Sequence, residues 1–191
     1  PEKGFLPISA QDVRSAIETG RILPSVIAKA KNTSEIGKAF GLGVLGYLGS
    51  VIEIETVSFP ARETGKGALR VNDTAGSMVK DSMFNAGSAL RKTFDIDLYN
   101  WDIHVNIIGG GQIDGPSAGL AITLAVFSAI TGLPLRQDVA VTGEVSLTGE
   151  VKAIGGIYEK IYGAKQAGMK AILVPSENQK GLKEIRGIDV K

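Results

Sequence analysis

The spacing of apolar residues along the chain predicts both strands and helices. Apolar and polar residues alternate over 51–57 and 101–108, which is the period of half-buried strands. Shorter apolar runs predict further strands at 69–71, 139–145, 151–154 and 171–174. The glycines at 65–67 predict a hairpin turn that leads into the strand at 69–71.

Helical patterns include three longer segments and a short one near the N-terminus. Apolar residues recur every three or four positions over 78–94 and 157–167, and almost every residue over 116–131 is apolar. The inner stripe predicted for the first of these helices consists of Val79, Met83, Ala86 and Leu90. The segment Ser9-Ala10-Gln11-Asp12 resembles a capping box with Asp in place of Glu, so a short helix is expected there. Because strands and helices are intermixed, the predicted fold class is α+β, with mixed sheets and packed helices.

The length of 191 residues fits one domain with a short appendage. Residues 20–37 are mixed and polar, as in a linker. We therefore expect residues 1–36 to form a helical segment and linker, and residues 37–191 to form the domain. The chain begins at Pro1 without an initiator Met or a signal peptide, as expected of a piece of a longer protein.

Residues 115–135 carry no charge, which raises the question of a membrane span. Glycine and proline at both ends leave only about 15 helical residues, fewer than the roughly 20 that cross a bilayer. We therefore expect a buried core helix and no membrane span. The formal net charge of +1 gives no indication of binding to nucleic acid or to an anionic membrane surface.

The counts of cysteine and histidine exclude several kinds of chemistry. The chain has no cysteine, which excludes disulfides, thiolate zinc sites and cysteine nucleophiles. It has one histidine, His104, which excludes sites with several histidine ligands, and we expect no metal or cofactor in this part of the protein. A half-exposed structural role is the simpler interpretation of His104, while a Ser-His hydrolase would have to use it. If the chain is an enzyme, its general base is expected to be another residue.

Two further patterns have simple structural explanations. Residues 41–46 match G-x-G-x-x-G, but a dinucleotide site needs a strand before the motif and a helix after it. Here a strand follows the motif, so close packing of strands explains it better. Glu53 and Glu55 could form a carboxylate pair for acid–base catalysis, although two carboxylates at this spacing on a strand more often form a solvated face.

The segment Asp114-Gly115-Pro116-Ser117-Ala118-Gly119 carries a stronger signal. Gly115 and Pro116 predict a tight turn into a helix, with Ser117 in the first helical turn. Backbone N–H groups in a first turn lack intrahelical partners, so they can stabilise an oxyanion next to a serine nucleophile. The motif alone leaves open whether Ser117 is a nucleophile or only a residue that begins a helix.

Lys160 falls on the inward face of the predicted helix at 157–167, within the stripe of Ile157 and Ile161. Burial lowers the pKa of a lysine and allows it to act as a general base, whereas a lysine at the edge of such a face can extend its ammonium to water. Ser117 and Lys160 together form a candidate Ser-Lys dyad, a known alternative to Ser-His-Asp. Thr142 ends a predicted strand, either as an ordinary β-branched residue or as a hydroxyl that hydrogen-bonds the lysine.

These motifs resemble the proteolytic domain of the Lon proteases. The segments that carry the resemblance are 114–119, 141–144 and 155–160. The resemblance is strong over 101–184 and weaker over 41–90. It implies a compact α+β domain in which Ser117 is the nucleophile and Lys160 is the general base.

The resemblance also implies supporting roles. Thr142 would hydrogen-bond the lysine, and Asp114 would be a supporting residue. Backbone amides near Ser117 and Asp114 would form the oxyanion hole. They belong to the turn that consists of Gly115, Pro116 and Ser117. The strand that ends in Ile108, Gly109 and Gly110 would bind an extended peptide by strand addition.

As a Lon-type domain, residues 37–191 would be a serine endopeptidase acting on unfolded or regulatory proteins. The resemblance implies a homo-hexameric ring in the cytoplasm that serves protein quality control. Residues 1–36 resemble the helical end of an upstream ATPase module, where ATP and Mg²⁺ would bind. The alternative is a catalytically silent Lon-like domain that serves ring assembly or binding.

Overall fold

A computed structural model describes residues 7–19, 28–45, 48–72, 76–108, 115–180, 182 and 185–191. Its helices are α1 (Ala10–Thr19), α2 (Ser77–Phe94), α3 (Gly119–Thr131) and α4 (Ile157–Gln166), with short 3-10 turns η1 (Leu98–Asn100), η2 (Pro116–Ala118) and η3 (Ser176–Asn178). Its longer strands are β2 (Lys38–Leu45), β3 (Leu48–Pro60) and β5 (Trp101–Ile108). The shorter strands are β1 (Ser34–Glu35), β4 (Leu69–Val71), β6 (Leu135–Arg136), β7 (Val139–Val141), β8 (Glu144–Val145), β9 (Val151–Lys152), β10 (Ala171–Leu173) and β11 (Asp189–Val190).

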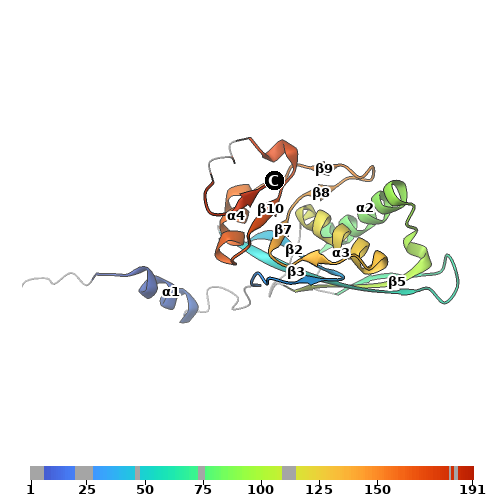
Figure 1. Cartoon of the computed structure of the whole chain (residues 1–191), viewed down its shortest axis with the longest axis horizontal. Coiled ribbons are helices and arrows are strands. Elements are labelled where there is room, and N and C mark those ends of the chain that lie inside the picture. The colour runs from blue at the N-terminus through green and yellow to red at the C-terminus, as the bar shows by residue number, and fades with distance from the viewer. Residues whose placement is uncertain are drawn as a thin grey trace, which may run out of the picture.

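The main sheet of the described residues has seven strands in the order β11-β10-β7-β2-β3-β5-β4 (Figure 1). β2 and β3 are antiparallel, with Lys38 opposite Glu55 and Leu45 opposite Leu48. β3 is also antiparallel to β5, whereas β7 is parallel to both β2 and β10. The sheet is thus mixed and is packed with helices, which confirms the predicted α+β class.

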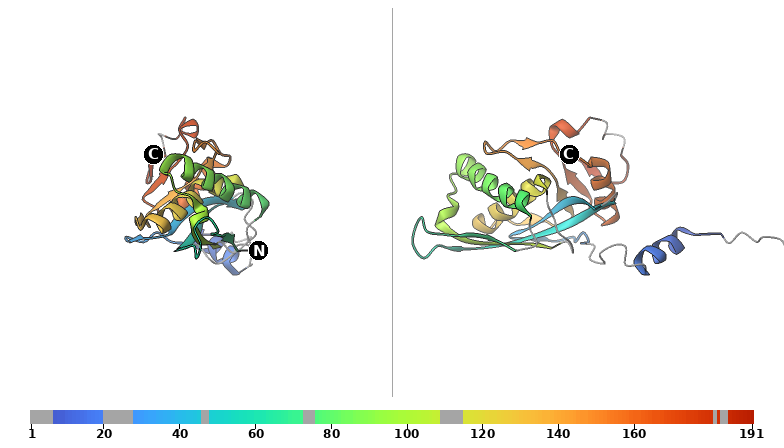
Figure 2. Two further views of the ribbon diagram at one scale, coloured as in Figure 1. Left: turned by 90° about the vertical axis from the view of Figure 1, so that its right-hand side faces the viewer. Right: turned by 180° about the vertical axis from the view of Figure 1, so that it is seen from behind.

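Side-chain alternation in the strands divides the core between the two faces of this sheet. Ala39 packs with residues of α2 and α3, whereas its neighbours Phe40 and Leu42 pack with Ile161 and Ala164 of α4. Because successive side chains of a strand point to opposite faces, α2 and α3 lie on one face and α4 on the other. The two views of Figure 2 show α2 and α3 next to each other on the same side of the sheet.

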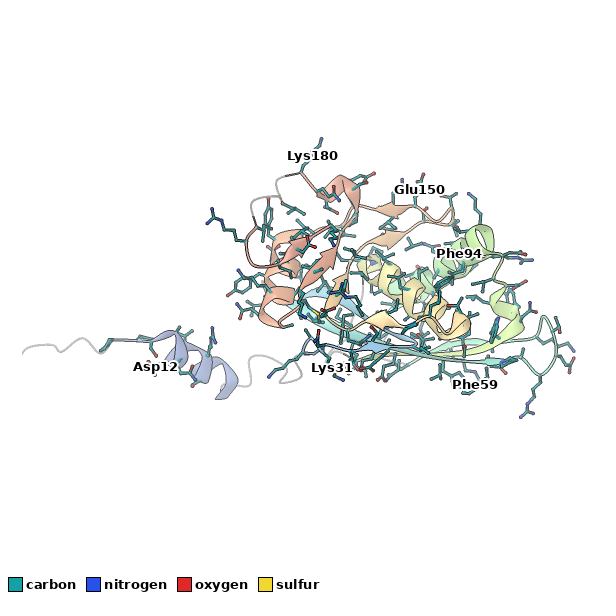
Figure 3. The ribbon with its side chains drawn as sticks, in the orientation of Figure 1. Asp12, Lys31, Phe59, Phe94, Glu150 and Lys180 are labelled. Atoms are coloured by element: carbon teal, nitrogen blue, oxygen red, sulfur yellow. The ribbon has the colours of Figure 1, made fainter. Side chains whose placement is uncertain are left out.

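The β3–β5–β4 part of the sheet is covered on one face only. Val57 and Phe59 of β3 are exposed, and Figure 3 shows Phe59 on the side of the sheet away from α2 and α3. Phe94, at the end of α2, instead packs on Phe127 of α3 with ring centroids 4.7 Å apart. The alternation predicted for the strand at 51–57 is confirmed by this contrast between the two faces.

The capping box predicted at the N-terminal helix is present. The Ser9 N–H donates to the Asp12 carboxylate at 2.8 Å, and the Asp12 N–H donates to the Ser9 hydroxyl at 3.1 Å. The hydrogen bonds from Ser9 lower the pKa of Asp12. These reciprocal bonds begin α1, which lies apart from the body of the molecule in Figure 1.

The chain already packs on the domain before residue 37. The Ala30 N–H donates to the Ala167 carbonyl at 2.9 Å, and the Lys31 N–H donates to the Gln137 carbonyl at 3.0 Å. β1 is paired with β6. The division of the chain between residues 36 and 37 stays a prediction, with residues 28–36 in contact with the domain that follows them.

Several predicted elements differ from the observed ones. The strand predicted over 139–145 is divided into β7, which belongs to the main sheet, and β8, which pairs with β9 in a separate sheet. The hairpin predicted at 65–67 is wrong, because β4 pairs in parallel with β5 and not with β3. The helix predicted over 116–131 begins as the 3-10 turn η2 and continues as α3.

α4 crosses β3 at very short range. A Cβ atom added to Gly163 would lie 2.3 Å from the backbone carbonyl of Gly49, and one added to Gly49 would overlap the Glu159 carbonyl oxygen. Real Cβ atoms do not approach backbone this closely, so both positions require glycine. The pair of glycines thereby sets the depth at which α4 lies on the sheet.

Replacing Gly163 tests this crossing. In an exposed helix interior, Gly→Ala stabilises by about 1 kcal/mol, but here we expect Gly163→Ala to lower the free energy of unfolding by about 2 kcal/mol. Gly87→Ala is the matched control, since the added Cβ in α2 would meet only the Leu98 side chain, at 3.1 Å. Urea denaturation measures both variants, and a Gly163→Ala variant as stable as Gly87→Ala would contradict the backbone contact.

Candidate active site

Ser117 lies in a turn in front of a helix. It is the middle residue of η2, and α3 starts two residues later. Gly115, just before the turn, has φ 152°, a conformation that other residues rarely adopt, and Pro116 begins the turn. The predicted tight turn is therefore present, with Ser117 in a 3-10 turn in place of the first turn of an α-helix. Ser117 is half-buried.

The main chain of this turn is hydrogen-bonded to the segment between β7 and β8. The Gly143 N–H donates to the Ser117 carbonyl at 3.0 Å, and the Thr142 hydroxyl donates to the same carbonyl at 3.3 Å. Thr142 is fully buried. A hydroxyl that donates one hydrogen bond can still accept another, so the hydrogen bond predicted from Lys160 to Thr142 is compatible with this geometry and stays a prediction.

Lys160 is buried on the inward face of α4, as its position in the helical pattern predicted. Its exposed fraction is 4 %, and Ile161 and Ala164 of the same helix are also buried. Removal from water disfavours the ammonium and lowers the pKa of Lys160 from 10.5 to about 8. Among the described residues, no carboxylate forms an ion pair with it. About half of Lys160 is therefore neutral near pH 8, far below the pH at which an ordinary lysine loses its proton, and the neutral amine is the form that a general base requires.

Strand β2 contacts both of the elements that carry the candidate catalytic residues. η2, which carries Ser117, and α4, which carries Lys160, both contact β2. In the described part of the chain no hydrogen bond joins the Ser117 hydroxyl to the Lys160 amine. Their direct contact in a Ser-Lys dyad stays a prediction.

The predicted peptide-binding strand is already paired on both edges near its end. The side chain of Asn72 donates to the Ile107 carbonyl at 3.2 Å and accepts from the Ile107 N–H at 3.0 Å. Main-chain groups of successive strand residues point to opposite edges, so those of Ile108 face β3, where Ile108 is opposite Glu53. A peptide that adds to this strand must therefore bind beyond Ile108.

Three predicted site residues, Asp114, Gly109 and Gly110, lie outside the described residues. Their roles in the oxyanion hole and in peptide binding stay predictions. By contrast, the sequence motif at 141–144 contains Gly143 but indicates no role for it. Its N–H donates to the Ser117 carbonyl and its carbonyl accepts from the Leu120 N–H of α3, a role that only the structure shows.

Glu53, Glu55 and His104, the other candidates from the sequence, have partners of their own. Glu53 forms an ion pair with Lys38, and the ammonium of Lys38 lies 3.8 Å from the Glu55 carboxylate. Burial opposes the charge of Lys38, but the hydrogen bond and negative charge of Glu53 raise its pKa. His104 is exposed, with its ring edge-on to Phe59 at a centroid distance of 6.5 Å. The structural interpretation fits His104, whereas Glu53 is paired with a buried lysine and does not form the solvated face that was predicted.

Residues 41–45 are part of β2 and do not begin a helix. A Cβ atom added to Gly43 would lie 2.8 Å from the Ile52 side chain of the paired strand β3, in agreement with the close packing of strands predicted for this glycine-rich segment. Within the residues that the structure describes, no group of three or more acidic, cysteine or histidine side chains is placed to hold a metal ion. None of the described helices has both the length and the apolar character to cross a membrane.

Comparison with known proteins decides the family. Residues 10–188 match the model of the Lon protease (S16) C-terminal proteolytic domain. The chain belongs to this family. The resemblance inferred from the motifs around Ser117, Thr142 and Lys160 is therefore confirmed at the level of the Lon proteolytic domain.

Individual Lon proteases are similar over most of the chain. Lon protease 2 of Bacillus subtilis is 38% identical, over 96% of this chain and 36% of the relative. Lon protease 1 of Thermus thermophilus is 34% identical, over 97% of this chain and 23% of the relative. Lon protease of Escherichia coli is 38% identical, over 82% of this chain and 20% of the relative. The chain thus spans only about a third or less of these relatives, at the proteolytic domain.

The buried charge of Lys160 has a measurable cost to stability. Lys160→Met is expected to raise the free energy of unfolding at neutral pH, because a pKa lowered from 10.5 to about 8 corresponds to roughly 3 kcal/mol. Below pH 8 the lysine is charged in both states and the full gain is present. Between pH 8 and 10.5 the folded wild type loses its proton first, so the gain decreases.

Urea denaturation between neutral pH and about pH 10 measures this gain. The control is Lys165→Met, which replaces an exposed lysine on the same helix and should give no such dependence on pH. A gain for Lys160→Met that stays constant over this range would show that the folded lysine has its ordinary pKa.

Proposed function

We propose that the chain is a serine endopeptidase domain in which Ser117 is the nucleophile and Lys160 is the general base. The observation that carries the proposal is the burial of Lys160 without an ion-pair partner in the described structure, with its pKa lowered to about 8. Membership of the Lon proteolytic-domain family supports peptide-bond hydrolysis as the reaction. The chain provides no cysteine, and its single histidine lies elsewhere.

In the proposed reaction, neutral Lys160 removes the proton from the Ser117 hydroxyl as its oxygen attacks the carbonyl carbon of the substrate peptide. A tetrahedral oxyanion forms, and backbone N–H groups near Ser117 and Asp114 stabilise it. The Lys160 ammonium then gives the proton to the leaving amine, and an acyl-enzyme remains on Ser117. Water, deprotonated by Lys160, hydrolyses this ester and regenerates the free serine.

Substrates in the proposal are unfolded or regulatory proteins that bind as extended chains. Because the edges of β5 are paired up to Ile108, the peptide would add to the main chain at Gly109 and Gly110. The Lon protease relatives are several times longer than this chain, which supports an upstream ATPase module as the site for ATP and Mg²⁺. The whole protein is proposed to work in the cytoplasm as a homo-hexamer for protein quality control.

Two alternatives have less support from the site. A catalytically silent domain would need neither a buried lysine without an ion-pair partner in the described structure nor an intact serine motif. A Ser-His hydrolase would require His104, whose side chain lies on the exposed face of β5. Ile103 and Val105 of β5 point to the opposite face, where they pack in one core with residues of α3. Ser117 lies in the turn that precedes α3 on that face.

Substitution of the two proposed catalytic residues tests the function. Ser117→Ala and Lys160→Met are each expected to lower kcat/KM on an unstructured protein by about 10³-fold or more. For the wild type, kcat/KM is expected to rise with pH and level off above a midpoint of about 8, because only the neutral amine accepts a proton. Proteolysis is measured by release of labelled peptides, and acylation of Ser117 by a fluorophosphonate is measured by mass spectrometry.

His104→Ala is the matched control and is expected to retain wild-type activity. Substantial hydrolysis by Ser117→Ala or Lys160→Met would contradict the dyad. A folded, assembled wild type that forms no Ser117 adduct would instead favour the silent domain.

A further inference from the structure

The Ser117 turn is attached to the main sheet through two consecutive residues. The carbonyl of Ser117 accepts from the Gly143 N–H at 3.0 Å and from the Thr142 hydroxyl at 3.3 Å. The Gly143 carbonyl in return accepts from the Leu120 N–H at 3.0 Å. The Thr142 N–H donates to the Leu173 carbonyl of β10, also at 3.0 Å. Residues 142 and 143 therefore link the start of α3 to a strand of the sheet.

The turn itself has little internal support. η2 is three residues long, and the N–H of Gly119 donates back to the Pro116 carbonyl. The hydrogen-bond ladder of α3 begins at its cap, Ala118, so the Ser117 carbonyl is not part of that ladder. The orientation of this carbonyl consequently depends on donors from outside the helix.

Holding the carbonyl restricts the nucleophile. The peptide unit between Ser117 and Ala118 is planar, so a fixed carbonyl oxygen limits rotation of the backbone that carries the serine hydroxyl. A displacement of a reacting atom by about 1 Å can cost about 100-fold in rate. Thr142 is fully buried, where a hydroxyl without a partner is unfavourable, so its bond to Ser117 is expected to persist.

We propose that Thr142 is a positioning residue for the nucleophile: its hydroxyl, together with the Gly143 N–H, fixes the Ser117 carbonyl and thereby the direction of the serine hydroxyl. This role rests on the proposed function. It is separate from a hydrogen bond between Thr142 and the lysine, because it uses the hydroxyl as donor to Ser117 and not as acceptor from Lys160. The two roles affect different measurable quantities, namely the maximal rate and the titration of the base.

The experiment compares Thr142→Val, which removes the hydroxyl with little change in shape, with Thr142→Ser, which keeps it. For each variant, proteolysis of an unstructured protein and acylation of Ser117 by a fluorophosphonate are followed as functions of pH, per folded molecule as measured by circular dichroism. Thr142→Val is expected to lower kcat and the acylation rate by about 10- to 100-fold. KM and the pH midpoint should stay unchanged, and Thr142→Ser should restore the rates.

Thr131→Val is the matched control at the far end of α3. It removes a hydroxyl that likewise donates to a main-chain carbonyl, that of Phe127 at 2.7 Å, and should leave kcat unchanged. Because Thr142→Val could fail to fold, Thr142→Ala is measured beside it and is expected to show the same slow acylation.

Two results would overturn the positioning role alone. One is a shifted pH midpoint with an unchanged maximal rate in Thr142→Val, which would assign the hydroxyl to Lys160. The other is a wild-type acylation rate in either variant that lacks the hydroxyl. A wild type that neither cleaves protein nor is acylated would overturn the proposed function, and this role with it.

Discussion

The backbone crossing of α4 over β3 is the constraint on which the site depends. Gly163 and Gly49 allow the two backbones to approach more closely than any pair of residues with Cβ atoms would allow. Lys160 lies one turn before Gly163 on the same helix, so the depth of this contact decides how far the lysine is withdrawn from water. Burial alone lowers the pKa of Lys160. The lowered pKa of Lys160 thus depends on how closely one helix packs on one strand.

A comparison of two buried lysines shows why the absence of a partner matters. Lys38, 9 % exposed, pairs with Glu53 and has two further carboxylates within 4 Å, and its pKa is raised. Lys160 is 4 % exposed, has no carboxylate partner among the described residues, and has a lowered pKa. Burial opposes the charge of both lysines, yet their pKa values shift in opposite directions, because nearby carboxylates compensate the loss of hydration at Lys38 only. A carboxylate partner stabilises the ammonium of a structural lysine. A buried lysine without such a partner is typical of a catalytic site.

The position of Ser117, the serine of the proposed dyad, depends on a break between two sheets. β7 belongs to the main sheet, and after Thr142 and Gly143 the chain enters β8, which pairs with β9 instead. At this break the main-chain groups of residue 143 are released from strand pairing and bind the start of α3. The serine turn is thereby fixed to the rigid part of the fold. Both halves of the proposed dyad derive their geometry from the sheet, one through β3 and the other through the end of β7.

The sequence alone determined the helices, the apolar stripe of α2 and the inward face that carries Lys160, because helix contacts connect residues three or four positions apart. The motif at Ser117 is a continuous segment and is visible in the sequence for the same reason, that its residues are near neighbours. The same motifs were sufficient to indicate the Lon family. The strand predicted over 139–145 is divided between two sheets, and the hairpin predicted at 65–67 was wrong, because strand pairing depends on segments distant in the sequence. Only the tertiary structure decided that Lys160 lacks a carboxylate partner in the described residues and that Thr142 holds the Ser117 carbonyl. Burial and hydrogen-bond partners at these positions come from other elements of the fold, and no local pattern encodes them.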